Sequence, residues 1–255
     1  MSQIDNPVHN LKAELEQMFQ LVSTQLTKAK EALTKFDKDL AREVIQIEKR
    51  VNGQELQIDR IAENFIALYS PVAIDLRFVL AVLKINNNLE RIGDIAEGIS
   101  KYIIESNSPL DQKLMEESNV IPMYEAAVRM LEETKMAFEN EDTLIARKIF
   151  KSDDYLDHIN IEAIQNLTEG MKSDPSKITD ALYIISIIRK LERIGDHLGA
   201  ASGQNQGMAA VGLRRETVEL VIAADPRLAA TAAVDHADAA ALRLQRGTER
   251  QIAAQ

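Results

Sequence analysis

Several residue types are absent or scarce in this chain of 255 residues, and each gap excludes a class of protein. The chain has no Cys, which excludes disulfides, thiolate metal sites and a Cys nucleophile. Trp is absent, aromatic residues make up only 4% of the chain, and Gly and Pro are few, so the composition favours helices over an all-β fold. No apolar run reaches the roughly 20 residues of a membrane span, and the first residues lack the pattern of a signal peptide. We therefore expect a cytoplasmic protein that is not inserted directly into a membrane.

The charge of the chain is strongly acidic, with a formal net charge of −10. Such a chain is a poor partner for nucleic acid, so we expect no nucleic-acid binding. Proteins that bind it are instead expected to present basic patches.

Hydrophobic residues recur at helical spacing through most of the chain. From Val8 to Phe36 they step by three or four residues, which is typical of a long amphipathic helix in a bundle. Similar patterns, separated by residues that cap or break helices, predict further helices over about 39–69, 71–107, 110–140, 143–172 and 178–198. Short connections make sequential helices antiparallel neighbours, so the predicted fold is all-α, with two tandem antiparallel three-helix bundles.

One six-residue motif, Leu-Glu-Arg-Ile-Gly-Asp, occurs twice, at Leu89–Asp94 and at Leu191–Asp196. The similarity extends beyond these residues, since Ile85 matches Ile187 at the same offset. A repeat of about a hundred residues indicates a duplicated unit and not a solenoid, whose period is roughly 20–50 residues.

Each motif places two carboxylates close together on a helix. Glu90 and Asp94 lie one turn apart on the same face, as do Glu192 and Asp196. Two such carboxylates repel each other and destabilise the helix unless a cation compensates. The cation can be the arginine within each motif, or it can be a bound metal ion, since hard cations take clusters of oxygen ligands. The residues alone leave both alternatives open.

Each motif also carries a glycine in mid-helix, Gly93 in the first and Gly195 in the second. There glycine costs roughly 1 kcal/mol of helix stability relative to alanine. A glycine at the same register in both copies predicts a close neighbour at that point, either a packed helix or a ligand.

The middle helix of each half carries a second pair of oxygen side chains at the same four-residue spacing. We expect each pair to face the motif of its own half, and four such oxygens suit a hard or borderline cation. Glu55 and Asp59 either extend the first site or lie at the surface, and we expect the surface. The predicted metal ligands are Glu48, Asn52, Glu90 and Asp94 in the first half and Asp153, Asp157, Glu192 and Asp196 in the second.

The doubled motif, preceded by the segment from Pro71 to Arg77, resembles the PhoU family of phosphate-transport accessory proteins. The resemblance implies two three-helix bundles in a cytoplasmic, often homodimeric, negative regulator of the phosphate-starvation response. It implies two partners, the ATPase of the phosphate ABC transporter and the phosphate-sensing histidine kinase. It also implies Fe, Zn, Mn or Mg ions at the paired acidic residues. Asn52 departs from that pattern, because a neutral amide binds a cation less strongly than a carboxylate does.

The composition changes after the second motif. From Gly199 onward the chain has no Lys and is rich in Ala and Arg. We expect Gly199, Gly203 and Gly207 to interrupt the sixth helix, unless that helix continues atypically. The predicted domains are therefore two repeats and an added tail, in which 215–224 and 228–245 form weakly amphipathic helices. Their boundaries are 1–108, 109–204 and 205–255.

The motifs of common enzyme classes are missing. No nucleophile–base pair, phosphate-binding loop or GxSxG motif is present, so we expect a regulatory protein that is not an enzyme. One alternative is a metal-dependent enzyme on a helical bundle, either a ferritin-like oxidase or a phosphatase. A ferritin-like site requires Glu-x-x-His on two helices, and no His here has a Glu three residues before it. The other alternative is a purely structural bundle. The duplicated glycine beside paired acids argues against it, because such a bundle has no need for this pattern.

Overall fold

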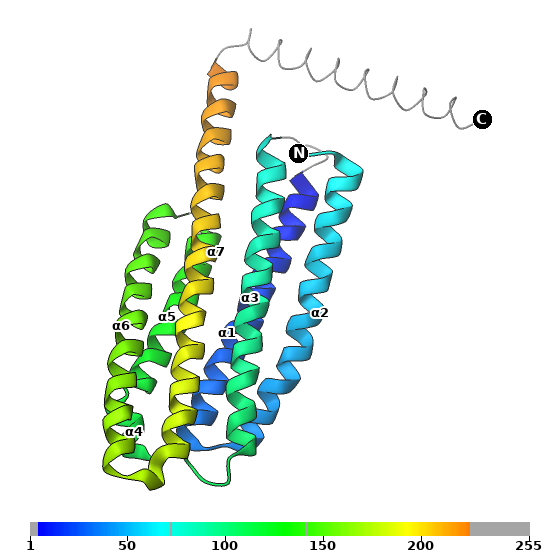
Figure 1. Cartoon of the computed structure of the whole chain (residues 1–255). Coiled ribbons are helices and arrows are strands. Elements are labelled where there is room, and N and C mark those ends of the chain that lie inside the picture. The colour runs from blue at the N-terminus through cyan, green and yellow to red at the C-terminus, as the bar shows by residue number, and fades with distance from the viewer. Residues whose placement is uncertain (1–4, 72, 141, 225–255) are drawn as a thin grey trace, which may run out of the picture. The chain divides into compact units, whose positions relative to one another are not determined.

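The chain folds into helices joined by short connections, as the computed structural model shows (Figure 1). The structure describes residues 5–71, 73–140 and 142–224, and within these ranges it contains no strand. Helices α1–α3 form one antiparallel bundle, and α5–α7 form the second, so the predicted all-α fold of two tandem bundles is confirmed. The elements are α1 (Asp5–Lys35), α2 (Lys38–Tyr69), α3 (Ala73–Glu105), α4 (Gln112–Glu117), α5 (Val120–Glu139), α6 (Thr143–Ser173), the 3₁₀ turn η1 (Pro175–Lys177) and α7 (Ile178–Ala224).

The middle helix of each bundle begins at an aspartate that caps it. Asp37 accepts hydrogen bonds from the backbone N–H groups of Asp39 and Leu40, at 3.0 and 2.9 Å. Asp142 caps α6 in the same way, accepting from the N–H groups of the second and third residues that follow it. These bonds satisfy N–H groups that the first turn of a helix leaves without a partner. An aspartate therefore fixes the start of the middle helix in each bundle.

The predicted fourth helix over 110–140 is wrong as a single element, because the structure divides it into α4 and α5. The break lies at Asn119, whose φ of 54° is left-handed. Asparagine tolerates this conformation better than most residues, so it can end one helix and begin the next at a new angle. The sequence pattern of apolar residues runs across this break and therefore concealed it.

The predicted interruption of the last helix is also wrong. Helix α7 continues through Gly199 and Gly203 to Ala224. Ala201 and Ser202, which lie between these glycines, are fully buried, and Ser202 Oγ lies 3.4 Å from Thr134 Oγ1 on α5. Packing against the bundle thus outweighs the roughly 1 kcal/mol that each glycine costs in a helix. The 215–224 segment is the end of this helix, and the 228–245 segment lies outside the described residues.

The first helix lies in the core, as its apolar stripe predicts. Its side chains at three- and four-residue steps are fully buried against α2, α3 and α5. Phe19 stacks at 5.8 Å on Phe138 of α5, and Lys30 forms an ion pair of 3.6 Å with Glu125 near the other end of α5. Residue numbers rise along α1 as they fall along α5, so the two helices are antiparallel. Their contact connects the two bundles.

The two helices that carry the motifs also pack side by side (Figure 1). Near the end of α3, Tyr102 OH lies 2.9 Å from Ser186 Oγ, which is early in α7. Further back on α3, Asn88 Oδ1 accepts a hydrogen bond of 2.9 Å from His197 Nδ1, which is later in α7. The helices are therefore antiparallel. The two motif copies lie beside each other at this seam, related by an approximate two-fold rotation.

The chain divides into two compact units, Met1–Ala210 and Val211–Gln255. Both predicted repeats belong to the first unit, and their boundaries at 108 and 204 stay a prediction. No helix in the part of the chain that the structure describes is both long and apolar enough to cross a membrane.

Candidate functional site

In the first bundle, the motif glycine lies directly beside a carboxylate of the neighbouring helix. A Cβ atom at Gly93 would lie 2.8 Å from Glu48 Oε2 and 3.1 Å from Val51 Cγ1. Glu48 is only 4% exposed, so its carboxylate is enclosed where α2 meets α3. The close neighbour predicted for this glycine is thus the acid of the middle helix.

A third helix contributes a residue that the sequence prediction missed. Gln25 of α1 is fully buried, and its Nε2 donates a hydrogen bond of 2.6 Å to Glu48 Oε2. The same Nε2 also donates to the carbonyl oxygen of Gly93 at 3.3 Å. Gln25 is a polar residue on the apolar face of α1, between Val22 and Ala29, and this pattern is the signal by which the sequence could have revealed it.

The first group of carboxylates carries unbalanced negative charge. Burial raises the pKa of Glu48 to about 7; the hydrogen bond from Gln25 opposes this rise, and the charges of Asp94, Glu97 and Glu90 add to it. The pKa of Glu90 is also raised, first by burial and then by Asp94, while Arg91 lowers it. Two buried oxygens of the group, Glu48 Oε1 and Glu90 Oε2, have no hydrogen-bond donor among the described residues. Negative charge is therefore held here without full compensation.

The second bundle repeats the arrangement. Asp153 Oδ1 approaches Gly195 so closely that a Cβ atom would collide with it, and a Cβ atom at Gly199 would lie 3.5 Å from Asp153 Oδ2. Burial raises the pKa of Asp153 to about 6, and the charges of Asp196, Asp157, Asp154 and Glu192 raise it further. The pKa of Glu192 is likewise raised, first by burial and then by Asp196 and Asp157. Asp153 and Glu192 therefore lie within electrostatic reach of each other, and Asp157 and Asp196 act on both of them.

The motif arginines compensate these charges only weakly. Arg91 is half-exposed, and its Nη1 lies 3.4 Å from Asp94 Oδ2. Its Nε lies 3.5 Å from Glu90 Oε2, an ion pair that lacks hydrogen-bond geometry. Exposed pairs of this kind contribute roughly 0–1 kcal/mol. In the described part of the second bundle, Arg193 forms no ion pair with Glu192 or Asp196.

The predicted ligands suit a cation by chemistry, but they are not assembled around one. Asn52 is exposed on α2, apart from the buried Glu48. Among the described residues, no group of three or more His, Asp or Glu side chains is gathered closely enough to hold a metal ion. Mutual repulsion is a physical reason for this spread, because the exposed Asp94, Asp157 and Asp196 can turn into solvent. The buried oxygens that lack a hydrogen-bond donor and the raised pKa values of the carboxyl groups nevertheless fit a metal site. A bound hard cation would bring these carboxylates closer together.

Four further residues beside the first group were misjudged or missed. Glu97 acts on Glu48, and its position three residues after Asp94 places it on the same helix face. Glu55 and Asp59, expected as plain surface residues, are half-buried. Asn86, which is fully buried, donates to Asp59 Oδ1 and to the carbonyl oxygen of Glu55, both at 3.1 Å.

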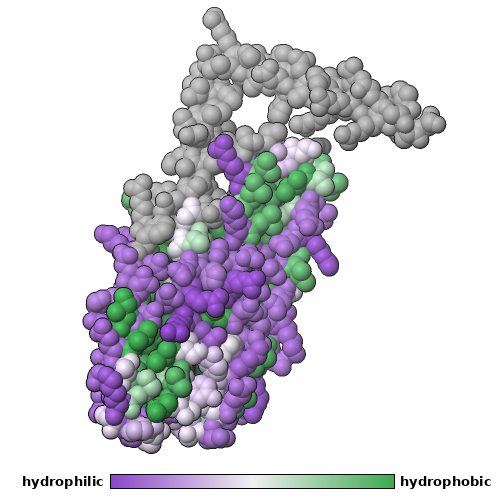
Figure 2. Space-filling model, viewed as in Figure 1, coloured by the Kyte–Doolittle hydropathy of each residue, from purple (hydrophilic) through white to green (hydrophobic). Residues whose placement is uncertain are grey.

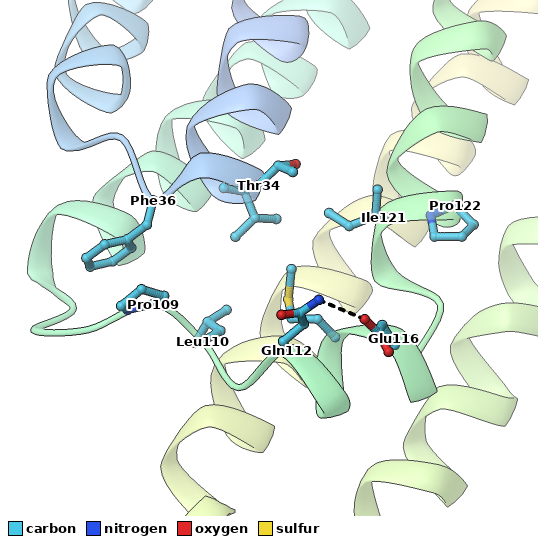
Figure 3. A pocket seen from close by; sticks show the side chains of 10 residues that line it. Thr34, Phe36, Pro109, Leu110, Gln112, Glu116, Ile121 and Pro122 are labelled. Carbon is cyan, nitrogen blue, oxygen red and sulfur yellow. Dashed lines mark hydrogen bonds between the residues drawn. The ribbon is translucent and has the colours of Figure 1, made fainter.

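An apolar pocket of about 530 Å³ lies away from these groups, where the turn after α1 meets α4 and the start of α5 (Figure 3). Phe36, Leu110 and Ile121 line it, and a hydrogen bond of 2.9 Å joins Gln112 to Glu116 beside them. None of the predicted metal ligands borders this pocket. The acidic groups therefore lie on the helix seams, apart from this pocket.

Known proteins are similar to this chain in sequence and in fold. The PhoU domain matches residues 15–103 and 120–200 of the chain, one segment for each bundle. A "phosphate-specific transport system accessory protein PhoU homolog" of Aquifex aeolicus is 34% identical over 184 residues, which cover 71% of this chain and 81% of the relative. The PhoU protein of Escherichia coli is 31% identical over 194 residues, which cover 76% of this chain and 80% of that protein.

Two solved PhoU structures have a fold similar to that of this chain. The crystal structure of PhoU from Pseudomonas aeruginosa superposes with a TM-score of 0.73 at 30% identity, covering 80% of this chain and 97% of that one. The phosphate transport system regulatory protein PhoU from Streptococcus pneumoniae gives a TM-score of 0.72 at 25% identity, over 80% of this chain and 95% of that one. The domain match, the curated relatives and the shared fold establish that this chain belongs to the PhoU family.

Proposed function

We propose that the chain is an accessory regulator of phosphate uptake and a negative regulator of the phosphate-starvation response. The support is its likeness to proteins named as accessory components of phosphate-specific transport systems, of whose length it covers about 80%. In this role it binds the ATPase of the phosphate ABC transporter and the phosphate-sensing histidine kinase. A regulator of this kind biases its partner between two states by binding one of them more tightly.

We also propose that each bundle holds one or more Fe, Zn, Mn or Mg ions. The observation that carries this proposal is the crowding of carboxylates in the two duplicated groups, where burial raises the pKa of Glu48 to about 7 and that of Asp153 to about 6, and neighbouring acids add to the rise. Glu48, Glu90 and Asp94, with Asn52 at the margin, would hold the ion of the first bundle. Asp153, Asp157, Glu192 and Asp196 would hold the ion of the second. Each bound ion would supply positive charge that offsets the repulsion between carboxylates.

The proposed role needs no catalysis, so we propose that the chain is not an enzyme. The enzyme alternative lacks a supporting observation, because the sequence has no Glu-x-x-His pair and the described acidic groups lie away from the apolar pocket. An assay of phosphate release from a phosphate monoester, with each of the four metals added, checks this point.

The partner proposal is tested by measuring binding of the chain to each of the two partners. Purified transporter ATPase and the cytoplasmic part of the sensor kinase are immobilised in turn, and the full chain is passed over each at low and at physiological salt. We expect saturable binding to at least one of them. Reproducible absence of binding to both at low salt would contradict the proposed function.

A further inference from the structure

The apolar pocket beside α4 is assembled from parts of the chain that are far apart in sequence. Thr34 belongs to the last turn of α1 and Phe36 to the turn after it, while Leu110 precedes α4 and Ile121 is at the start of α5 (Figure 3). Its volume of about 530 Å³ lies within the roughly 300–1,000 Å³ that is usual for binding pockets. We call it the α4 pocket.

The α4 pocket lies at one end of the molecule. Figure 2 shows hydrophilic residues across the middle of the visible face and hydrophobic residues toward its upper and lower ends. Helix α4 and the turn after α1 are at the lower end in the same view (Figure 1). The pocket is therefore in a part of the molecule where apolar residues also reach the surface.

Phe36 holds a backbone conformation that is unfavourable for a bulky residue. Its φ is 52°, in the left-handed region, and the N–H of Asp37 donates to the carbonyl oxygen of Ala32 at 3.0 Å. This bond closes a Schellman motif at the end of α1, in which glycine is the usual residue at the position of Phe36. A side chain costs conformational energy there. The ring of Phe36 must therefore contribute something that glycine cannot.

That contribution is a wall of the α4 pocket. With Leu33 and Leu110, which also line the pocket, Phe36 borders a gap of about 10 Å³ that extends to Tyr183 of α7. A gap of this size holds about one water molecule at most, so these side chains close the pocket on that side. Lys38 Nζ lies 5.4 Å from the centre of the Phe36 ring. Strained backbone of this kind clusters at sites that hold ligands.

Polar contacts hold the walls of the pocket in place. Lys38 donates to the carbonyl oxygens of Ile104 and Ser106, at 2.9 and 2.6 Å, and so ties the turn after α1 to the end of α3. The connection before α4 is held at Asp111, whose N–H donates to Asp180 Oδ2 at 2.9 Å. Walls that are already fixed lose little conformational entropy when a partner binds between them.

The polar atoms that line the pocket are mainly hydrogen-bond acceptors. Thr34 Oγ1 donates its proton to the carbonyl oxygen of Lys30 at 2.8 Å, so only its lone pairs remain. Gln112 Nε2 donates to Glu116 Oε1 at 2.9 Å, which leaves the amide oxygen of Gln112 and the other carboxylate oxygen of Glu116. A group that complements these atoms must itself donate hydrogen bonds.

The described lining of the pocket contains one charged residue, the exposed Glu116, which forms no ion pair with any described residue. The charges that adjoin the lining residues along the chain are compensated. Asp37 accepts from two backbone N–H groups at the start of α2, and Lys38 is bonded to carbonyl oxygens. The others are in ion pairs: Lys35 with Glu31, Asp111 with Lys177, and Lys113 with Glu117. Glu116 therefore gives the pocket a negative charge that a cation can approach.

We propose that the α4 pocket binds an apolar side chain of a partner protein that carries a lysine or an arginine beside this side chain. The proposal rests on the proposed function, in which the chain acts by binding proteins, and adds the docking site and the chemistry of the partner. The apolar walls bury the side chain, while Glu116 and the amide oxygen of Gln112 accept hydrogen bonds from the cation. The net charge of −10 acts in the same direction, because it attracts basic partners.

The test measures Kd of the full chain for two probes, the purified transporter ATPase and the cytoplasmic part of the sensor kinase. Thr34→Phe fills part of the pocket, and it should raise Kd at least tenfold for a probe that the unsubstituted chain binds. Glu116→Lys should raise Kd about tenfold at low salt and by less at high salt. Glu116→Gln removes the charge but keeps an acceptor, so its effect should be smaller than that of Glu116→Lys.

Two variants outside the pocket serve as matched controls. Thr27→Phe changes an exposed threonine two turns earlier on α1, and Glu117→Lys reverses the charge of the residue that follows Glu116 on α4. Neither residue lines the pocket. Neither variant should change Kd, and the melting temperatures of all five variants should stay close to that of the unsubstituted chain.

The outcomes separate this inference from the function on which it rests. If the unsubstituted chain binds a probe and the pocket variants bind it as well as the controls do, the docking site is wrong and the proposed function stands. The docking site is also wrong if these variants leave both probes unaffected but abolish self-association in sedimentation equilibrium, or abolish binding of 2-phenylethylammonium observed by NMR. The pocket would then join two copies of this chain, or hold a small organic cation. If the unsubstituted chain binds neither probe, both proposals fail.

Discussion

Gly195 of α7 lies directly against the carboxylate of Asp153 on α6, just as Gly93 of α3 lies against Glu48 on α2. In both bundles the missing side chain makes the space that the middle-helix acid occupies. The duplication has therefore kept a matched pair of residues on different helices, and not only a motif within one helix.

The first prediction concerns the space beside Gly195. Replacing an unhindered helical glycine with alanine raises stability by roughly 0.5–1 kcal/mol. We expect that gain for Gly53→Ala, because no described atom of a neighbouring element lies within 4 Å of the added Cβ atom. In Gly195→Ala the Cβ atom collides with Asp153 and Leu156, so this variant should be less stable than Gly53→Ala by about 1–3 kcal/mol. Urea unfolding measures both variants, and an equal gain would show that the glycine has no steric role.

The second prediction concerns Gln25. In Gln25→Leu, Glu48 Oε2 loses its buried donor, and the free energy of unfolding should fall by about 1–3 kcal/mol. In the double variant Gln25→Leu/Glu48→Leu neither of these polar groups is left without a partner, so most of the loss should be recovered. A double-mutant cycle in urea compares the four proteins. A double variant as unstable as the two losses added together would show that the hydrogen bond is not what couples them.

The third prediction is a pH dependence of the metal-free protein. The folded-state pKa values of Glu48 and Asp153, near 7 and near 6, exceed their ordinary values of 4.5 and 3.8. Below the ordinary values both states carry the protons, and these groups cost the fold nothing. As pH rises through this window, the unfolded chain releases the protons first, so the free energy of unfolding falls.

Replacing both acids removes this contribution. Chelator-treated Glu48→Gln/Asp153→Asn should therefore lose less stability than the unsubstituted chain does between about pH 4.5 and about pH 7. Urea unfolding at several pH values measures both slopes. Two identical slopes would contradict the raised pKa values.

The fourth prediction concerns the residues after the bundles. Residues 1–210 form one compact unit, and every described side chain of the buried core lies within it. Deletion of residues 211–255 should therefore leave the thermal melting midpoint, followed by circular dichroism, within a few degrees of the full chain. A midpoint far below that of the full chain would make the tail integral to the fold.

Local features of this fold were readable from the sequence. Asp37 and Asp142 act within one helical turn, so their capping role depends on neighbours along the chain. The break at Asn119 was missed because a left-handed residue leaves the apolar period intact. The continuation through Gly199 was missed because packing, and not local preference, decides it.

The candidate site was also predictable only where its residues lie on one helix. The four-residue spacing identified Glu90, Asp94, Glu192 and Asp196, since that relation is set by the helix itself. Gln25 and the antiparallel seam between Asn88 and His197 depend on contacts between helices far apart in sequence. No pattern along one helix contains that information.

Elemental analysis of the purified chain shows whether both motif copies hold metal ions, as we propose. The analysis is repeated on a variant in which Glu90, Asp94, Glu192 and Asp196 are all alanine, and on two variants that change one motif only. We predict that the unsubstituted chain carries at least an equimolar amount of metal. Each single-motif variant should lose part of it, and the fourfold variant should lose all of it. Absence of metal from the unsubstituted chain, even after incubation with iron, zinc, manganese and magnesium, would contradict the claim.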